Sequence, residues 1–222
     1  RVQAMETISA EAEDLFNNND YNGAKQKALD GLAERDRIVA SFDDVAEKTI
    51  GDGKMAFDAA SQTYEKMLGF FSAPATRTVA VDSRIEARRQ SEAADLAARR
   101  EAAQQRLNEA NQNRAQRQFK KAIEQGKEVS AVSEGVSNGT FKIVAEHALL
   151  SVQDEVSELE RQGAREEAAR QLNEVQALVE KTQSLIRDNQ NREAAEHTAK
   201  ARAYLENVKQ DLSRRALAER NR

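Results

Sequence analysis

The chain has 222 residues, 39% of them hydrophobic and 32% charged, and it carries a formal net charge of −4. It contains no cysteine, which excludes disulfides, thiol catalysis and thiolate metal sites. Its negative charge argues against a global attraction to nucleic acid or anionic membranes. One proline and nine glycines are too few turn-forming residues for a sheet protein, whereas the abundant Ala, Glu, Gln, Arg and Lys are good helix formers. The composition therefore predicts an all-α chain.

The first 75 residues are predicted to form a helical hairpin and a third helix. In each helix the apolar residues recur every three or four positions, which is the spacing of one buried helix face. A polar turn at residues 17–20 separates the first two helices, and Asp20 can cap the second. Gly51 and Gly53 are expected to end the second helix, and Pro74 the third. The three predicted helices span residues 3–19, 20–50 and 54–71.

The third of these helices carries the most aromatic stretch of the chain, around Met67, Phe70 and Phe71. A cluster of this kind most often fills the core of a small bundle. Its second interpretation is an interface with a protein partner, and its third is contact with a membrane. The three residues are therefore candidate partner-binding residues, with burial in a core as the first interpretation.

Segment 76–126 is predicted to be one long helix, because no glycine or proline occurs between residues 79 and 125. Its apolar residues recur every eleven positions, with Ile85, Leu96 and Leu107 in register and Phe119 one place late. Eleven residues make about three turns, so the apolar stripe runs nearly parallel to the helix axis. The stripe consists largely of alanine, and an isolated helix of this kind would depend on intrinsic propensity. We therefore expect a partner helix from this chain or from another copy.

The same segment is basic, with ten Lys and Arg against five Asp and Glu between residues 84 and 121. A basic stripe could contact phosphates, acidic lipid or a protein partner. The acidic residues are interleaved with the arginines, however, which favours ordinary ion pairs on a solvated coiled-coil face. The candidate partner-binding residues on this helix are Arg88, Arg89, Arg99 and Arg100.

Residues 127–139 are predicted to be a linker or loop, because Gly126, Gly135 and Gly139 lie close together. The C-terminal segment, residues 140–222, is predicted to form three helices, and Thr140 can cap the first of them. A second polar turn is expected at residues 188–191. The four segments are expected to form one continuous elongated domain.

Short polar turns followed by a small residue on the inner helix face occur before Ala24, Ala168 and Ala195. A small residue at that position lets two helices approach closely. The pattern, over roughly ten residues at each place, resembles the turn and second-helix start of tetratricopeptide-type repeats. The resemblance implies a protein-binding array of stacked helix pairs without catalysis. The roughly 34-residue period of that family is absent, and the interpretation we favour is that any antiparallel hairpin produces this pattern.

The residues that would support catalysis or metal binding do not occur in a recognisable spacing. His147 and His197 are the only histidines, and neither has a glutamate three positions before it, as helical two-metal sites require. Both are expected at a helix surface or boundary. The glycine loops of nucleotide-binding proteins, the nucleophile elbow and the EF-hand pattern are missing. We therefore predict no enzymatic activity, no cofactor and no metal site.

These observations predict an antiparallel helical bundle of hairpins with one long, alanine-rich, coiled-coil-like helix. The predicted function is that of a structural or scaffolding protein that mediates protein–protein association or self-assembly. The alternative is a binder of nucleic acid or of an anionic surface through the basic long helix. The absence of cysteine and the richness in Ala, Gln and Asn favour a bacterial envelope or periplasm slightly over the cytoplasm.

Overall fold

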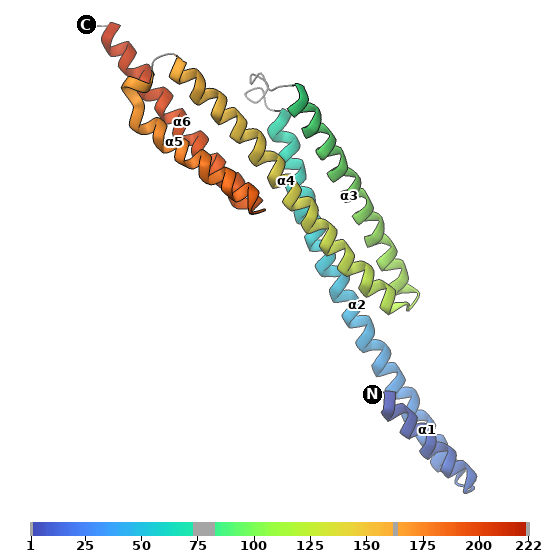
Figure 1. The fold of residues 1–222 in the computed structure, drawn as a ribbon. Coiled ribbons are helices and arrows are strands. Elements are labelled where there is room, and N and C mark those ends of the chain that lie inside the picture. Colours follow the sequence, from blue (N-terminus) through green and yellow to red (C-terminus); the bar gives the residue numbers. More distant parts are fainter. Residues whose placement is uncertain (1, 73–82, 162–163, 221–222) are drawn as a thin grey trace. The chain divides into compact units, whose positions relative to one another are not determined.

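The computed structural model describes residues 2–72, 83–161 and 164–220, and these residues form helices and turns with no strand among them (Figure 1). The prediction of an all-α helical bundle is therefore confirmed. The described helices are α1 (Val2–Asn17), α2 (Tyr21–Ser72), α3 (Ser83–Ala115), α4 (Phe119–Arg161), α5 (Ala164–Arg187) and α6 (Asn191–Arg220).

The chain divides into two compact units, and each unit combines stretches that are far apart in the sequence. Unit 1 comprises Arg1–Met55 and Gln104–Ser130, and unit 2 comprises Ala56–Ala103 and Ala131–Arg222. The boundaries between the units therefore fall inside α2, α3 and α4. The predicted segments do not coincide with these units, because their boundaries were placed at expected helix breaks.

The three helical hairpins α1–α2, α3–α4 and α5–α6 close through turns of the same geometry. The middle residue of each turn has a positive φ, which is 64° at Asn19, 59° at Arg117 and 59° at Asn189. The next residue donates its backbone N–H to the carbonyl five positions earlier at 2.8–2.9 Å, as in the Schellman motif that ends many helices. The polar turns predicted at residues 17–20 and 188–191 are confirmed, and Asp20 caps α2 by accepting a hydrogen bond from the Gly23 N–H at 2.9 Å.

A buried alanine follows each turn on the inner face of the second helix. Ala24, Ala122 and Ala194 are 8%, 0% and 0% exposed, and their small side chains let the two helices of a hairpin lie close together. At the last turn the buried alanine is therefore Ala194, one residue before the predicted Ala195. The equivalent alanine after the α3–α4 turn, Ala122, was not predicted. Of the turn expected before Ala168, Gly163 lies outside the described residues and residues 164–167 belong to α5, which Ala168 itself interrupts with φ −131° and ψ 24°.

The predicted helix break at Gly51 and Gly53 is wrong, because α2 continues without interruption from Tyr21 to Ser72. Gly53 is buried against α4, where a Cβ atom added to it would lie 2.7 Å from the carbonyl oxygen of Gly126. A Cβ added to Gly126 would lie 3.1 Å from the backbone of Thr49. These two glycines therefore allow α2 and α4 to approach closely within unit 1, and they do not serve as helix stops. Pro74, which was expected to end the third helix, lies outside the described residues.

The predicted long helix over residues 79–125 is also wrong in its extent. The chain reverses at residues 116–118, so that α3 ends at Ala115 and α4 begins at Phe119. The apolar stripe predicted on this segment is present in α3, where Leu96 and Leu107 are each 5% exposed. Both leucines pack against helices of the same chain, so the partner helix expected for this stripe comes from the chain itself.

The prediction of a linker at residues 127–139 is wrong, because these residues lie within α4 and some of their side chains are buried. Val129 and Val136 are 0% and 1% exposed. Thr140, predicted to cap a helix, is buried in the middle of α4 and donates its hydroxyl to the carbonyl of Val136 at 2.8 Å. The amide of Asn138 accepts a hydrogen bond from Nδ2 of Asn191 at 3.1 Å, which joins α4 to the start of α6.

Unit 2 contains the larger apolar core, and α4 contributes to it on two faces. One face of α4 packs with α2 and α3, where Tyr64, Met67 and Leu96 surround Ile143. The other face packs with α5 and α6 in a cluster of buried leucine, valine and alanine side chains. The members of this cluster are Leu149, Val152, Val156, Ala168, Leu172, Val175, Val179, Ala201, Leu205 and Val208. Helix α4 is thus held between two helix pairs.

Candidate functional site

The predicted aromatic residues lie in unit 2, where they contact other side chains of the same unit. Met67 is 1% exposed and belongs to the core, as the first of its three interpretations predicts. Phe70 and Phe71 are half-buried and meet edge to face, with ring centroids 5.2 Å apart. Both rings also contact the imidazole of His147, with centroid distances of 6.2 Å from Phe70 and 4.8 Å from Phe71. The end of α2 therefore packs on α4 through an aromatic cluster.

Two of the predicted arginines form ion pairs within their own helix. The Arg88 Nε lies 2.9 Å from a carboxylate oxygen of Glu92, and an Nη2 of Arg99 lies 2.8 Å from Asp95. Both pairs have the i, i+4 spacing that the interleaved charges predicted. Exposed pairs of this kind contribute little to stability, about 0.2–1 kcal/mol. They do, however, offset part of the local positive charge of α3.

The other two predicted arginines connect α3 to α2. The Arg89 guanidinium lies 4.1 Å from the centroid of the Phe71 ring and forms an ion pair with Glu86. Arg100 lies 5.1 Å from the centroid of the Tyr64 ring and 3.6 Å from a carboxylate oxygen of Glu65. Cations placed over aromatic faces in this way are attracted by the ring quadrupole. Arg89 and Arg100 therefore pack the two helices together within unit 2.

His147 was expected at a helix surface or boundary, and this expectation is wrong because its side chain is buried, with 6% exposure. Its Nδ1 atom is shielded from solvent and has no hydrogen-bond partner among the described residues. Burial lowers the pKa of His147 below its ordinary value, and the nearby positive charges of Arg89 and Arg202 lower it further, while Glu86 raises it. The imidazole is therefore favoured in its neutral form. His197 lies half-buried on α6.

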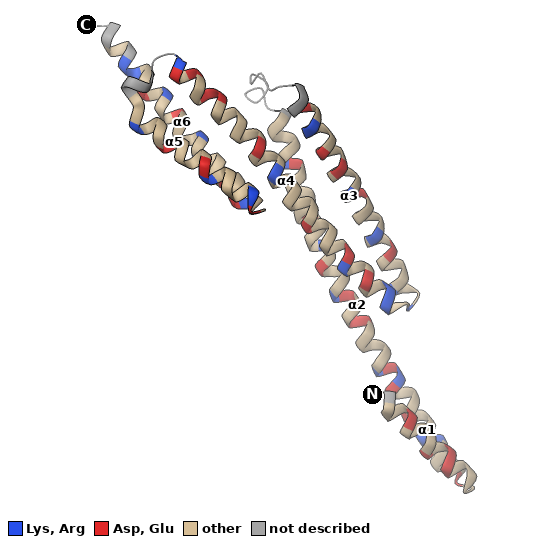
Figure 2. Cartoon of the chain, in the orientation of Figure 1, with Lys and Arg blue, Asp and Glu red and all other residues tan. Residues whose placement is uncertain are grey.

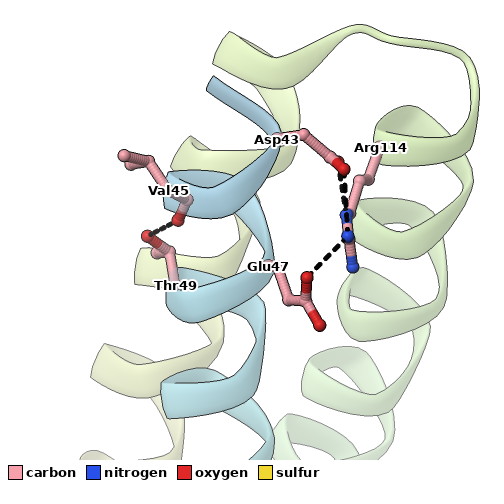
Figure 3. Close-up of polar contacts among 5 residues, drawn as sticks. All are labelled: Asp43, Val45, Glu47, Thr49 and Arg114. Carbon is pink, nitrogen blue, oxygen red and sulfur yellow. Dashed lines mark hydrogen bonds and ion pairs between the residues drawn. The ribbon is translucent and has the colours of Figure 1, made fainter. Parts of the chain in front are cut away.

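A second group of charged residues lies in unit 1, where α3 meets α2 (Figure 3). The Arg114 guanidinium donates to both carboxylate oxygens of Asp43, from Nε at 2.7 Å and from Nη2 at 3.2 Å. The same Nη2 donates to Glu47 at 2.8 Å. These hydrogen bonds lower the pKa of Asp43 and raise the pKa of Arg114. Periodicity did not reveal this contact, because the two partners are separated by 71 positions.

Exposed apolar side chains concentrate in unit 1. Of the nine large hydrophobic residues that are described as exposed, seven belong to unit 1. Leu29, Leu32, Phe42 and Val45 of α2 are 49%, 48%, 53% and 49% exposed. Across the described residues from position 3 to position 45, Ala24 is the only buried apolar side chain. The α1–α2 hairpin therefore has a thin seam and an apolar outer surface.

The seam of this hairpin contains polar as well as apolar residues. Half-buried side chains of α1 recur at a spacing of three and four residues. The amino group of Lys27 donates to Glu11 across the seam. A Cβ added to Gly31 would lie 3.4 Å from a methyl group of Ile8, so the two helices touch without interlocking large side chains. The half-buried residues of α1 are Met5, Ile8, Ala12 and Leu15.

The described residues offer neither a metal site nor a membrane-spanning helix. The described residues include no cluster of His, Cys, Asp and Glu that could hold a metal ion. None of the described helices is long and apolar enough to cross a membrane. Figure 2 shows acidic and basic residues interleaved along α2, α3 and α4.

The fold places the chain in the class of all-α helical bundles. A scan against protein-family models and searches of the curated proteins and the solved structures find no match.

Proposed function

We propose that this chain is a non-catalytic structural or scaffolding protein that mediates protein–protein association or self-assembly, and that the α1–α2 hairpin provides the contact surface. The observation that supports this proposal is the distribution of apolar side chains in the hairpin. Up to Val45 the described residues bury only Ala24, while Leu32 and Phe42 remain about half exposed. A helical hairpin with this distribution becomes more stable when a partner covers its outer surface.

The physical argument rests on how helices are stabilised. A fully buried Val, Leu, Ile or Phe side chain contributes about 1.5–3 kcal/mol, and most helical stability in proteins comes from such packing rather than from intrinsic propensity. The hairpin lacks this contribution along its seam, where the half-buried positions of α2 include the charged residues Lys27 and Glu34. Covering the exposed halves of Leu32 and Phe42 by a partner would supply roughly 1 kcal/mol from each side chain.

The alternative proposal, binding of nucleic acid or of an anionic surface, has no comparable support. The four arginines that would carry it each contact a carboxylate, in the pairs Arg88–Glu92, Arg89–Glu86, Arg99–Asp95 and Arg100–Glu65. A phosphate would have to compete with these carboxylates. We therefore prefer protein association, which requires no ion pair to be broken.

Sedimentation equilibrium over a wide concentration range tests the proposal for self-assembly. We expect the wild-type chain to associate, and we expect Leu32→Gln combined with Phe42→Gln to weaken the association at least tenfold. Leu217→Gln is the matched control, because Leu217 is 59% exposed on α6 of unit 2. The control should associate as the wild type does.

A photo-crosslinking amino acid at position 42, introduced in the native cell, tests association with a different protein. The proposal predicts crosslinks from position 42 to one predominant protein and none above background from position 217. A chain that remains monomeric at all concentrations and gives equal crosslinking from both positions would refute the proposal. Hydrogen exchange supplies a further measure, since the amides of α1 should exchange more slowly in the associated state.

A further inference from the structure

Unit 2 contains a cavity that is lined in part by His147 and that the proposed association does not use. It has a volume of about 330 Å³ and lies between α3, α4 and α5. Pockets that bind small molecules have volumes of roughly 300–1,000 Å³, so this cavity is at the small end of that range. The lining residues include Arg88, Arg89, Ile143, Glu146, His147 and Leu150.

One wall of the cavity is apolar and belongs to α4. Ile143 and Leu149 are 4% and 6% exposed, and Leu150 is half-buried. Positions 143, 147 and 150 lie on one face of a helix because they are separated by four and three residues. This wall favours a ligand with an apolar body, since covering it removes apolar surface from water.

The polar group that remains without a partner at this wall is the imidazole of His147. Its Nδ1 is shielded from solvent and has no hydrogen-bond partner among the described residues, whereas Nε2 is not among the buried atoms that lack a partner. The rings of Phe70 and Phe71 hold the imidazole by edge contacts. Nε2 of a neutral imidazole either donates or accepts, depending on the tautomer. A hydroxyl group satisfies both cases, because it can donate and accept.

The charged residues at the cavity balance one another. Arg88 is paired with Glu92, and Arg89 with Glu86. Glu146 lies 3.8 Å from the amino group of Lys142. A charged ligand would have to displace one of these partners and leave a charge behind, which is costly where side chains are partly buried. An uncharged ligand leaves all three pairs intact.

We propose that this cavity binds an uncharged amphipathic small molecule with a hydroxyl group, such as a phenol. Its apolar body lies against Ile143, Leu149 and Leu150. Its hydroxyl group forms a hydrogen bond with Nε2 of His147.

A matched set of four probes tests both the site and the chemistry of its ligand. The probes are 4-ethylphenol, ethylbenzene, 4-ethylbenzoate and 4-ethylbenzylamine, which share the apolar body and differ in the polar group. The readout is the imidazole resonance of His147 in the full chain, measured by NMR. His197 is the only other histidine and does not line the cavity, so its resonance is an internal control.

We expect 4-ethylphenol to shift the His147 resonance saturably and to leave that of His197 unchanged. The two charged probes should bind at least tenfold more weakly, and ethylbenzene should bind more weakly than the phenol. His147→Phe keeps an aromatic ring against Phe71 and removes both ring nitrogens. This variant, followed through the amide resonances of α4, should abolish the preference for the phenol over ethylbenzene.

A cavity-filling variant keeps the test independent of His147. Leu150→Trp should abolish binding of all four probes, whereas Leu217→Trp, on the exposed surface of α6, should leave binding unchanged. Three results would overturn the proposal: no saturable shift for any probe up to its solubility, binding of 4-ethylbenzoate as tight as that of the phenol, or undiminished binding to a folded Leu150→Trp chain.

Discussion

The contact between Gly53 and Gly126 leads to a sharp prediction about two glycines on the same helix. Gly51 and Gly53 both lie inside α2, but a Cβ atom added to Gly51 would meet nothing within 4 Å, whereas one added to Gly53 would lie 2.7 Å from the carbonyl oxygen of Gly126. We therefore expect Gly51→Ala and Gly53→Ala to change the free energy of unfolding in opposite directions.

The magnitude follows from two contributions. Replacing glycine by alanine inside a helix stabilises it by about 0.5–1 kcal/mol, because glycine loses more conformational freedom on folding. Gly51→Ala should show this gain alone. At Gly53 the close contact involves backbone, so α2 and α4 must separate by roughly 0.5 Å or more, which weakens the dispersion contacts around it. Overpacking of this kind costs about 1–3 kcal/mol, and Gly53→Ala should be less stable than Gly51→Ala by a similar amount.

Urea unfolding followed by far-ultraviolet circular dichroism measures the two variants against the wild type. Because both glycines belong to unit 1, hydrogen exchange at the neighbouring buried residue Ile50 reports on the same contact without relying on global unfolding. Gly126→Ala, whose added Cβ would lie 3.1 Å from the Thr49 backbone, should be destabilising by a smaller amount. Equal stability of Gly51→Ala and Gly53→Ala would show that α2 and α4 do not approach as closely as the structure has them.

Three further predictions concern single residues. Arg117 adopts a φ of 59°, a conformation that costs non-glycine residues about 1–2 kcal/mol. Arg117→Gly should therefore raise the free energy of unfolding by about 1 kcal/mol in urea titrations. Asn189→Gly, at the equivalent turn, should change this free energy less, and equal effects of the two substitutions would argue against strain at Arg117. The pKa of His147 is lowered below 6.5 in the folded state, so the unfolded state binds the proton more readily. Stability should therefore fall as the pH drops below about 6.5, and thermal unfolding of the wild type at several pH values should show this loss. The same loss of stability in His147→Gln would assign it to another titrating group. Arg114 lowers the pKa of Asp43 from its ordinary value of 3.8. Arg114→Gln should therefore raise this pKa toward 3.8, which an NMR titration of the carboxyl carbon can measure. An unchanged pKa would mean that the ion pair does not persist in solution.

The helical class and two of the three hairpin turns could be predicted from the sequence because they depend on local chemistry. The turn at residues 17–20 combines asparagines with Asp20, and both residue types favour turns and helix caps. The burial of Leu96 and Leu107 followed from their regular spacing, since a straight apolar stripe needs a neighbouring helix. These features depend on composition, on residues close together in the chain or on a regular spacing, and all of these can be read from a single sequence.

The turn between α3 and α4 could not be predicted because its left-handed residue is an arginine. Glycine and asparagine are the usual residues in this conformation, and the other two turns have Asn19 and Asn189 there. One signal was present in the sequence. The eleven-residue apolar repeat slips by one place at Phe119, immediately after the turn, and such a slip can mark the end of a continuous helix face.

The glycines were misinterpreted for a different reason. A glycine can end a helix, or it can let two helices touch, and a single sequence does not distinguish the two roles. Gly53 and Gly126 have the second role, and the decisive information is that they face one another across 73 positions of the chain. The burial of His147 is a long-range property of the same kind, since it depends on Phe71 from α2 and Arg89 from α3.

The two units differ in how far they cover their own apolar residues. In unit 2 the apolar residues of α4 are covered on both sides, and His147, beside a small cavity, is one of several buried polar residues that have an atom without a hydrogen-bond partner among the described residues. In the α1–α2 hairpin the seam combines half-buried apolar residues of α1 with small and charged residues of α2, and the large apolar residues Leu32 and Phe42 are about half exposed. A larger side chain at Gly31 would not give the hairpin a core of its own, because Gly31 of α2 already contacts Ile8 of α1. The apolar surface of the hairpin can therefore be buried only by something that approaches from outside, and the properties of that surface, rather than any reactive group, are what should select the partner.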